Sequence, residues 1–222
     1  MTRLLDIFFS SLAIFIFSPI LICIVIILRF TGEGEVFFLQ DRVGKDKKNF
    51  TLFKFATMLK DSENIGTGTI TLHNDPRILP FGSFLRKTKL NELPQLFNIL
   101  NGTMSVIGPR PQTKRCYEAF PLASIEQIKK VKPGLSGIGS IVFRDEELMM
   151  NSQENADAFY DTTIMPYKGI LEEWYVKNDN VYSYFKLIIL TILVVVNSNP
   201  KIVWKFFKDL PSPPDSLLKY FK

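Results

Sequence analysis

The longest apolar stretch of the chain runs from Leu4 to Phe30, interrupted only by Asp6, scattered serines and Arg29. As a helix rising about 1.5 Å per residue, it is long enough to cross a bilayer core of roughly 30 Å. Ser18-Pro19 stands near its middle. Because proline removes a backbone donor and clashes with the preceding turn, the sequence predicts a kink there.

This segment does not have the pattern of a secretory signal. Only Arg3 stands in the leading region, no small-residue cleavage site follows, and Cys23 comes after Leu21-Ile22 rather than after a small residue. A kinked single-pass helix and a re-entrant hairpin both remain open. In the hairpin the polar residues of both ends would share one interface, but these residues do little to separate the two alternatives. Basic residues from Arg42 onward place the rest of the chain in the cytoplasm.

Beyond the membrane segment, alternating apolar residues predict a β-hairpin, and longer periodic stretches predict helices. The expected fold is an α-rich α+β domain with interfacial amphipathic helices. Its elements are strands at 36–40 and 49–55 around a Gly44–Lys48 turn, a mobile loop at 60–74, and helices at 78–87, 119–131, 160–184 and 186–196. The last of these is too short to span a bilayer.

The C-terminal tail alternates aromatic residues with lysines around Pro211-Ser-Pro-Pro214. Such a pattern suits contact with a membrane surface, and packing against the body of the protein is the alternative. The expected organisation is therefore a membrane-embedded segment at 1–31, a cytoplasmic domain at 32–200 and a membrane-surface tail at 201–222.

Composition supports a phosphate-bearing partner at a membrane. The 222 residues carry a net charge of +5, and 20 phenylalanines and 46% hydrophobic residues favour a membrane surface over nucleic acid. Two cysteines, Cys23 and Cys116, are too few for a disulfide framework and indicate a reducing compartment. The single histidine, His73, has no Cys/His cluster around it, so no zinc site is expected.

The chemistry is concentrated between Arg86 and Pro111. Three cations, Arg86, Lys87 and Lys89, precede the single carboxylate Glu92. The stretch ends in Gly-Pro-Arg-Pro, where prolines on both sides of Arg110 stiffen the loop that carries it. Guanidinium and ammonium groups around one acid suit a phosphorylated, metal-bound substrate. A solvated basic face beside a helix start is the alternative.

This stretch, with the Leu-Pro-Gln-Leu and Gly-Pro-Arg-Pro sequences in it, resembles the core signature of the bacterial sugar transferases, the polyprenyl-phosphate phosphoglycosyl transferases. The resemblance extends from about residue 4 to about residue 196 and includes Gln40-x-Arg42-Val-Gly44. Two positions depart from the family pattern: Asn91 replaces the Asp of an Asp-Glu pair, and Ala56 replaces an Arg.

The resemblance implies a small monotopic enzyme with a re-entrant helix broken at Ser18-Pro19. It implies transfer of a sugar-1-phosphate from a UDP-sugar to undecaprenyl phosphate, with Mg²⁺, at the cytoplasmic face of the bacterial inner membrane. That reaction is the first membrane step in making exopolysaccharide, lipopolysaccharide and other surface glycans. The implied partners are the donor, the polyprenyl phosphate acceptor, the lipid bilayer and downstream glycosyltransferases. No nucleic acid is expected, and the sequence does not identify the sugar.

The implied site can be carried over residue by residue. Catalysis is expected at Glu92 and Asn91, with Glu92 also binding metal. Phosphate and substrate binding is expected at Lys54, Arg86, Arg110 and Arg144, and Ser18 and Pro19 shape the membrane hairpin. The acidic run 145–147 could assist a metal, and a solvated acidic surface is the favoured interpretation. The glycines of 134–139 resemble a phosphate-binding loop, a weak signal outside a dinucleotide fold.

Asn91 complicates the implied mechanism. In the family, the corresponding Asp is taken to attack the donor's β-phosphate, whereas an amide is a poor nucleophile. Three alternatives follow: Glu92 attacks, the acceptor phosphate attacks directly, or the protein binds ligands without turnover as a membrane-bound scaffold. We expect an active transferase because Glu92, the cations and the membrane segment are all present.

Overall fold

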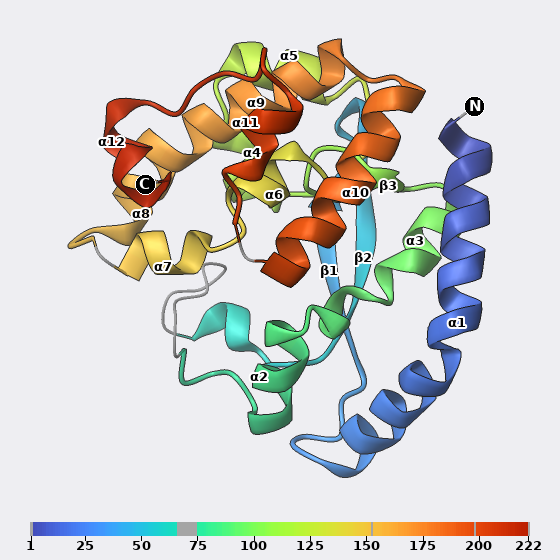
Figure 1. Cartoon of the computed structure of the whole chain (residues 1–222). Helices are drawn as coiled ribbons and strands as arrows, with labels where there is room; N and C mark the ends of the chain where they lie inside the picture. Colours follow the sequence, from blue (N-terminus) through green and yellow to red (C-terminus); the bar gives the residue numbers. More distant parts are fainter. Residues whose placement is uncertain (1, 66–74, 152, 198, 222) are drawn as a thin grey trace.

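The structure is a computed structural model that describes residues 2–65, 75–151, 153–197 and 199–221, so much of the predicted 60–74 loop, His73 included, lies outside it. Figure 1 shows its arrangement, with the apolar helix along one side of a helix-rich body. The helices are α1 (Thr2–Phe30), α2 (Pro80–Lys87), α3 (Gln95–Asn101), α4 (Lys114–Glu118), α5 (Leu122–Ile128), α6 (Ile138–Val142), α7 (Glu146–Asn151), α8 (Ala156–Phe159), α9 (Met165–Lys177), α10 (Val181–Asn197), α11 (Ile202–Phe206) and α12 (Asp215–Leu218). The strands are β1 (Phe37–Val43), β2 (Asn49–Phe55), β3 (Ser105–Ile107) and β4 (Gly134–Ser136), with short 3₁₀ turns at 45–47, 62–64, 90–92 and 219–221 and a π-helical turn at 160–164.

The apolar helix α1 is continuous through Pro19. Pro19 has no N–H for the carbonyl of Phe15, and the Ser18 hydroxyl donates to that carbonyl instead at 2.9 Å. Figure 1 shows the axis of α1 changing direction part-way along its length. The Ser-Pro pair therefore bends the helix without ending it.

The first turns of α1 attach to the body through a buried carboxylate. Asp6 is 3% exposed. Its Oδ1 accepts hydrogen bonds from Ser105 Oγ, Val106 N and Tyr184 OH, each at 2.9 Å. Nearby, Arg3 donates to the Leu100 carbonyl at the end of α3, at 2.7 Å. These bonds join α1 to β3, α3 and α10.

The last turns of α1 attach to the same body through apolar packing. Ile24 and Leu28 are buried in a cluster with Phe55 of β2 and Leu85 of α2. Within the part of the chain that is described, α1 is the one helix long and apolar enough to cross a membrane, and little of its most apolar window is buried. Both ends of the apolar helix thus contact one body, and most of its surface is left without a protein partner.

The predicted hairpin is confirmed, with its first strand shifted toward the turn. β1 and β2 pair antiparallel from Phe37–Phe55 to Val43–Asn49. Asn98 of α3 fixes β2, since its side-chain amide donates to the Thr51 carbonyl at 2.8 Å and its Oδ1 accepts from Phe53 N at 2.9 Å. This clamp sets α3 and the turn before it against the strand that carries Lys54.

Two glycines of the predicted phosphate loop pack closely against Gly108. β4 pairs parallel with β3. A Cβ at Gly134 would lie 2.1 Å from the Gly108 nitrogen, and a Cβ at Gly137 would lie 2.1 Å from the Gly108 carbonyl oxygen. Only glycine permits this approach of backbones. The packing of the strand pair that leads into Arg110 is therefore sufficient reason for glycine at these two positions.

The C-terminal tail packs into the main core. The tail residues buried there include Val203, Phe207, Leu210, Leu217 and Phe221. The aromatic side chains expected at a membrane surface are therefore largely core residues. Alternating aromatics and lysines are equally compatible with a helix that covers a core, and the contact with the body decides between the two.

The two C-terminal helical segments also differ from expectation. The helix predicted over 160–184 is divided at Asn178, between α9 and α10. One face of α10 is buried, through Ser183, Tyr184, Leu187, Leu190 and Val194. Its other face is exposed, which agrees with the prediction of a buried or interfacial helix. Cys23 is exposed, Cys116 is buried, and both are free thiols.

Replacing Asp6 by leucine should destabilise the fold strongly. Asp6→Leu leaves three donors without their acceptor, and each buried unsatisfied group costs roughly 1–3 kcal/mol. We expect a loss of about 3 kcal/mol or more in the free energy of unfolding. Thermal unfolding in detergent measures it. In the Asp6→Leu background, Tyr184→Phe should cost less than in the wild type, because the hydroxyl has already lost its partner. Equal costs in both backgrounds would show that the bond contributes nothing.

Candidate active site

A short turn before α3 presents the two central residues of the predicted site. Leu90–Glu92 form a 3₁₀ turn, entered through Lys89 in the left-handed region (φ 59°). A non-glycine residue in that region is strained and often lies near a functional site. Pro94 then precedes α3, which ends at Gly102 with φ 84°. The turn is thus held between a strained residue and a helix fixed to β2.

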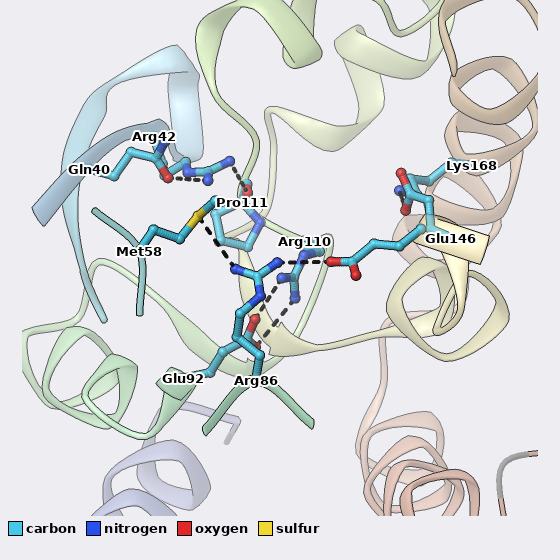
Figure 2. A network of polar contacts seen from close by, with 10 residues as sticks. Gln40, Arg42, Met58, Arg86, Glu92, Arg110, Pro111, Glu146 and Lys168 are labelled. Carbon is cyan, nitrogen blue, oxygen red and sulfur yellow. Dashed lines mark hydrogen bonds and ion pairs between the residues drawn. The ribbon is translucent and has the colours of Figure 1, made fainter. Parts of the chain in front are cut away.

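Glu92 and Arg110 form the central ion pair of the site. Arg110 Nη2 lies 2.7 Å from Glu92 Oε1, and Arg110 Nη1 lies 3.4 Å from Oε2 (Figure 2). Burial would raise the pKa of Glu92, but the charges of Arg110 and Lys54 outweigh it and hold that pKa far below its usual range. The charge of Glu92 in turn raises the pKa of Arg110. Glu92 is therefore a carboxylate at every physiological pH.

Lys54 is the weakly charged cation of this group. Burial and then the positive charge of Arg42 lower the pKa of Lys54 from 10.5 to about 7, while Glu92 opposes the shift. Near neutral pH only part of the molecules carry a protonated Lys54. A phosphate bound beside it would favour the protonated form, so ligand binding and proton uptake are coupled at this position.

The acidic run that follows Arg144 lies in the site. Lys168 Nζ is 2.5 Å from Glu146 Oε2 (Figure 2). Arg86 Nη2 is 2.9 Å from Glu147 Oε1. Both acids are therefore ion-paired, and Glu147 is in addition 46% exposed at its side chain. Spacing along the sequence could not show that α7 folds back over Arg86.

Sequence reasoning missed Arg42 and Lys168 as site residues. Arg42 donates to Gln40 and, at 3.3 Å, to the Pro111 carbonyl (Figure 2). It also lowers the pKa of Lys54. Gln40 and Arg42 belong to the family pattern, and their spacing places both on one face of β1. Nothing in the sequence indicates Lys168 as a site residue, since it stands in an aromatic helix far from the other site residues along the chain.

Arg42 and Lys168 line one large cavity of about 1050 Å³. Lys54, Arg86, Asn91, Glu92, Arg110 and Arg144 all line it, so the structure brings the six predicted cytoplasmic site residues together. Among the lining residues, cationic side chains outnumber acidic ones, eight to five. Ser18 and Pro19 of α1 do not line it. The cavity is large enough for a drug-sized ligand and more, and its polar end suits an anionic group.

Among the lining residues, Asn91 and Arg144 have contacts that bear on the roles expected for them. Asn91 is buried, and its Oδ1 has no hydrogen-bond partner among the described residues. A buried amide oxygen without a partner is costly, and a ligand or ion could satisfy it. Arg144 donates to the Val194 carbonyl near the end of α10 at 2.6 Å, so it lies at the edge of the cavity.

Comparison with known proteins agrees with this geometry. The family model described as "Bacterial sugar transferase" matches residues 1–198. The chain belongs to the bacterial sugar transferase family. The N-terminal helix and the body that carries the cation cluster both lie within the matched residues.

Several relatives of this sugar transferase have named activities. A UDP-N-acetylgalactosamine-undecaprenyl-phosphate N-acetylgalactosaminephosphotransferase of Aeromonas hydrophila is 37% identical over 63% of this chain and 33% of its own length. A UDP-glucose:undecaprenyl-phosphate glucose-1-phosphate transferase of Escherichia coli is 39% identical over 61% of this chain and 30% of its own length. The exopolysaccharide production protein ExoY of Rhizobium meliloti is 34% identical over 65% of this chain and 70% of its own length. The chain therefore spans about a third of the length of the Aeromonas and Escherichia relatives.

The sugar transferase has no preformed all-protein metal cage in its described part. There, no group of three or more His, Cys, Asp or Glu side chains is placed to hold a metal ion. Mg²⁺ commonly binds through one or two protein oxygens together with substrate phosphates and water. Glu92 and the unpartnered Asn91 Oδ1 are two neighbouring oxygen donors of that kind. The residues therefore fit a metal that arrives with a phosphorylated ligand.

Removing the charge of Glu92 should lower the pKa of Lys54 further. In Glu92→Gln the burial and the charges of Arg42 and Arg110 remain, and the one carboxylate that raises this pKa is lost. A lysine NMR titration should show the pKa of Lys54 falling below about 7. The matched control Glu35→Gln, which removes the exposed partner of Lys60, should leave it unchanged. An unchanged value in Glu92→Gln would show that Glu92 does not act on Lys54.

Proposed function

We propose that this protein transfers a sugar-1-phosphate from a UDP-sugar to undecaprenyl phosphate, the first membrane step in making a bacterial surface glycan. The observation that carries the proposal is the carboxylate Glu92, which is held by Arg110 and acts on Lys54, in one large cavity that Arg86 also lines. The names of the Aeromonas and Escherichia relatives state donors and an acceptor of this class.

The cations would bind the donor's diphosphate. Guanidinium groups match phosphate oxygens in pairs, so Arg86 and Arg110 are the main ligands and Lys54 adds a charge once it is protonated. Arg86 Nη2 lies 2.9 Å from Glu147 Oε1, and a bound phosphate would compete with that carboxylate for Arg86. Arg144, at the cavity edge, is proposed to meet the nucleotide.

Asn91 favours direct transfer over a covalent intermediate. An amide is a poor nucleophile, and both oxygens of Glu92 already face Arg110. We assign the attack to an oxygen of the acceptor phosphate, which forms a bond to the donor's β-phosphorus. The bond from that phosphorus to the bridging oxygen breaks, and UMP leaves with the electron pair. No net proton moves in this step.

The protein's groups would stabilise charge during this transfer. Arg110, Arg86 and Lys54 face the phosphoryl oxygens, and Glu92 with Asn91 Oδ1 would hold Mg²⁺. When bound, Mg²⁺ would supply further positive charge at the transferring phosphate. Glu92 is thus proposed as a metal ligand and Asn91 as its neutral neighbour.

The attachment of α1 supports a re-entrant position in the bilayer. Asp6 near one end and Leu28 near the other both pack on the same body, which a helix spanning the bilayer from side to side would not allow. We therefore place α1 as a bent helix that enters and leaves on the cytoplasmic face of the inner membrane. The lipid-linked product would then be accessible to downstream glycosyltransferases on that face.

The test is UMP release by the protein in nanodiscs with undecaprenyl phosphate, Mg²⁺ and a panel of UDP-sugars. We expect release with one sugar and a loss of roughly a hundredfold or more in Glu92→Gln, because the change removes the proposed metal ligand and the partner of Arg110, on which stabilisation of the transferring phosphate depends. Glu126→Gln, an exposed carboxylate on α5, is the matched control and should retain activity.

Three outcomes would contradict parts of the proposal. No release with any sugar, from folded protein that binds UDP-sugar, would exclude the transferase. Activity only in Asn91→Asp would show that the native chain is not a competent enzyme. A burst of UMP equal to the enzyme concentration, formed before acceptor is added, would indicate a covalent intermediate and exclude direct transfer.

A further inference from the structure

One wall of the cavity is aliphatic. The α10 residues that line it are Ile188, Thr191, Ile192, Val194 and Val195. Ile192 is 59% exposed and Val195 is 50% exposed. Residues 188, 192 and 195 follow one another at helical spacing, so they form a continuous stripe along the helix.

This wall does not suit a sugar. Thr191 is its one hydroxyl, and that hydroxyl is engaged, since Oγ1 donates to the Leu187 carbonyl at 2.7 Å and lies 2.8 Å from Ser136 Oγ. A sugar placed there would leave its own hydroxyls without partners, which is unfavourable. Hydrocarbon, by contrast, gains free energy by covering exposed aliphatic side chains.

The stripe joins the phosphate end of the cavity to an apolar exterior. Arg110 lines the same cavity, and Arg144 caps the carbonyl of Val194 at the end of the stripe. Beside the stripe, on the same exposed face of α10, Ile189 is 50% exposed and Val196 is 80% exposed, and neither lines the cavity. A ligand with a phosphate head and a hydrocarbon chain matches this order of surfaces.

From this order we infer that the α10 stripe of Ile188, Ile192 and Val195 binds the first isoprene units of the polyprenyl phosphate acceptor. The inference rests on the proposed function, because that function supplies the amphiphilic ligand. The acceptor phosphate would face Arg110, and its chain would pass along α10 into the surrounding lipid. The donor would then occupy the polar side formed by Arg86 and Lys54.

The kinetic test compares two exposed isoleucines of the same helix. Ile192→Asn removes a lining residue, and Ile189→Asn makes the same change one turn away, outside the cavity. We expect Ile192→Asn to raise the KM for undecaprenyl phosphate by about tenfold and to leave the KM for UDP-sugar unchanged, because lost apolar contact is specific to the chain. Ile189→Asn should change neither value by more than about twofold.

Two kinetic outcomes would overturn the inference. An equal effect of both substitutions would mean that α10 acts only through general contact with the bilayer. A rise in the KM for UDP-sugar with Ile192→Asn, and none for the acceptor, would assign the wall to the donor.

A second measurement does not require turnover. A diazirine-bearing isoprenyl phosphate, irradiated with the wild-type protein in nanodiscs, should label α10 around 188–195, and excess undecaprenyl phosphate should prevent the labelling. Labelling confined to α1, or labelling that undecaprenyl phosphate does not compete with, would exclude this chain path. Labelling of α10 that undecaprenyl phosphate prevents, without UMP release, would support the binding site and exclude the transferase activity. The experiment therefore distinguishes failure of the binding-site inference from failure of the proposed function.

Discussion

The carboxylate of Asp6 holds together the parts on which the site depends. It accepts bonds from Ser105, Val106 and Tyr184, and so connects α1 with β3 and α10. β3 leads within a few residues to Arg110, and α10 supplies one wall of the cavity. A single buried acid in an otherwise apolar segment thus links the apolar helix α1 to the loop that carries Arg110 and to the wall proposed for the lipid. Its three donors compensate for the cost of burying the charge.

The cavity itself is built for a ligand that brings negative charge. Cations outnumber acids along it, the pKa of Lys54 is lowered to about 7, and Arg86 is paired with Glu147. The lowered pKa of Lys54 and the Arg86–Glu147 pair both reduce repulsion among the cations. A bound diphosphate would favour the protonated form of Lys54 and would compete with Glu147 for Arg86.

Asn91 changes what the turn before α3 can do. Its buried amide oxygen has no partner in the described part of the structure, next to a carboxylate that Arg110 keeps ionised. The pair offers two oxygen ligands and one negative charge. An amide at position 91 is a poor nucleophile, which disfavours covalent attack from that residue, and the two oxygens are the ligands proposed for a phosphate-bound metal.

The sequence by itself determined the elements whose signals are local. Apolar length predicted α1, alternation predicted the hairpin, and the run of cations with Gly-Pro-Arg-Pro predicted the phosphate end of the site, because each pattern depends on neighbours in the chain. The tertiary structure alone decided where remote segments meet. It placed Glu147 on Arg86, Gly134 and Gly137 against Gly108, and Phe207 and Phe221 in the core. Local sequence cannot distinguish a solvated acid from a paired one, or a core aromatic from an interfacial one, since the difference lies in a contact made by distant residues.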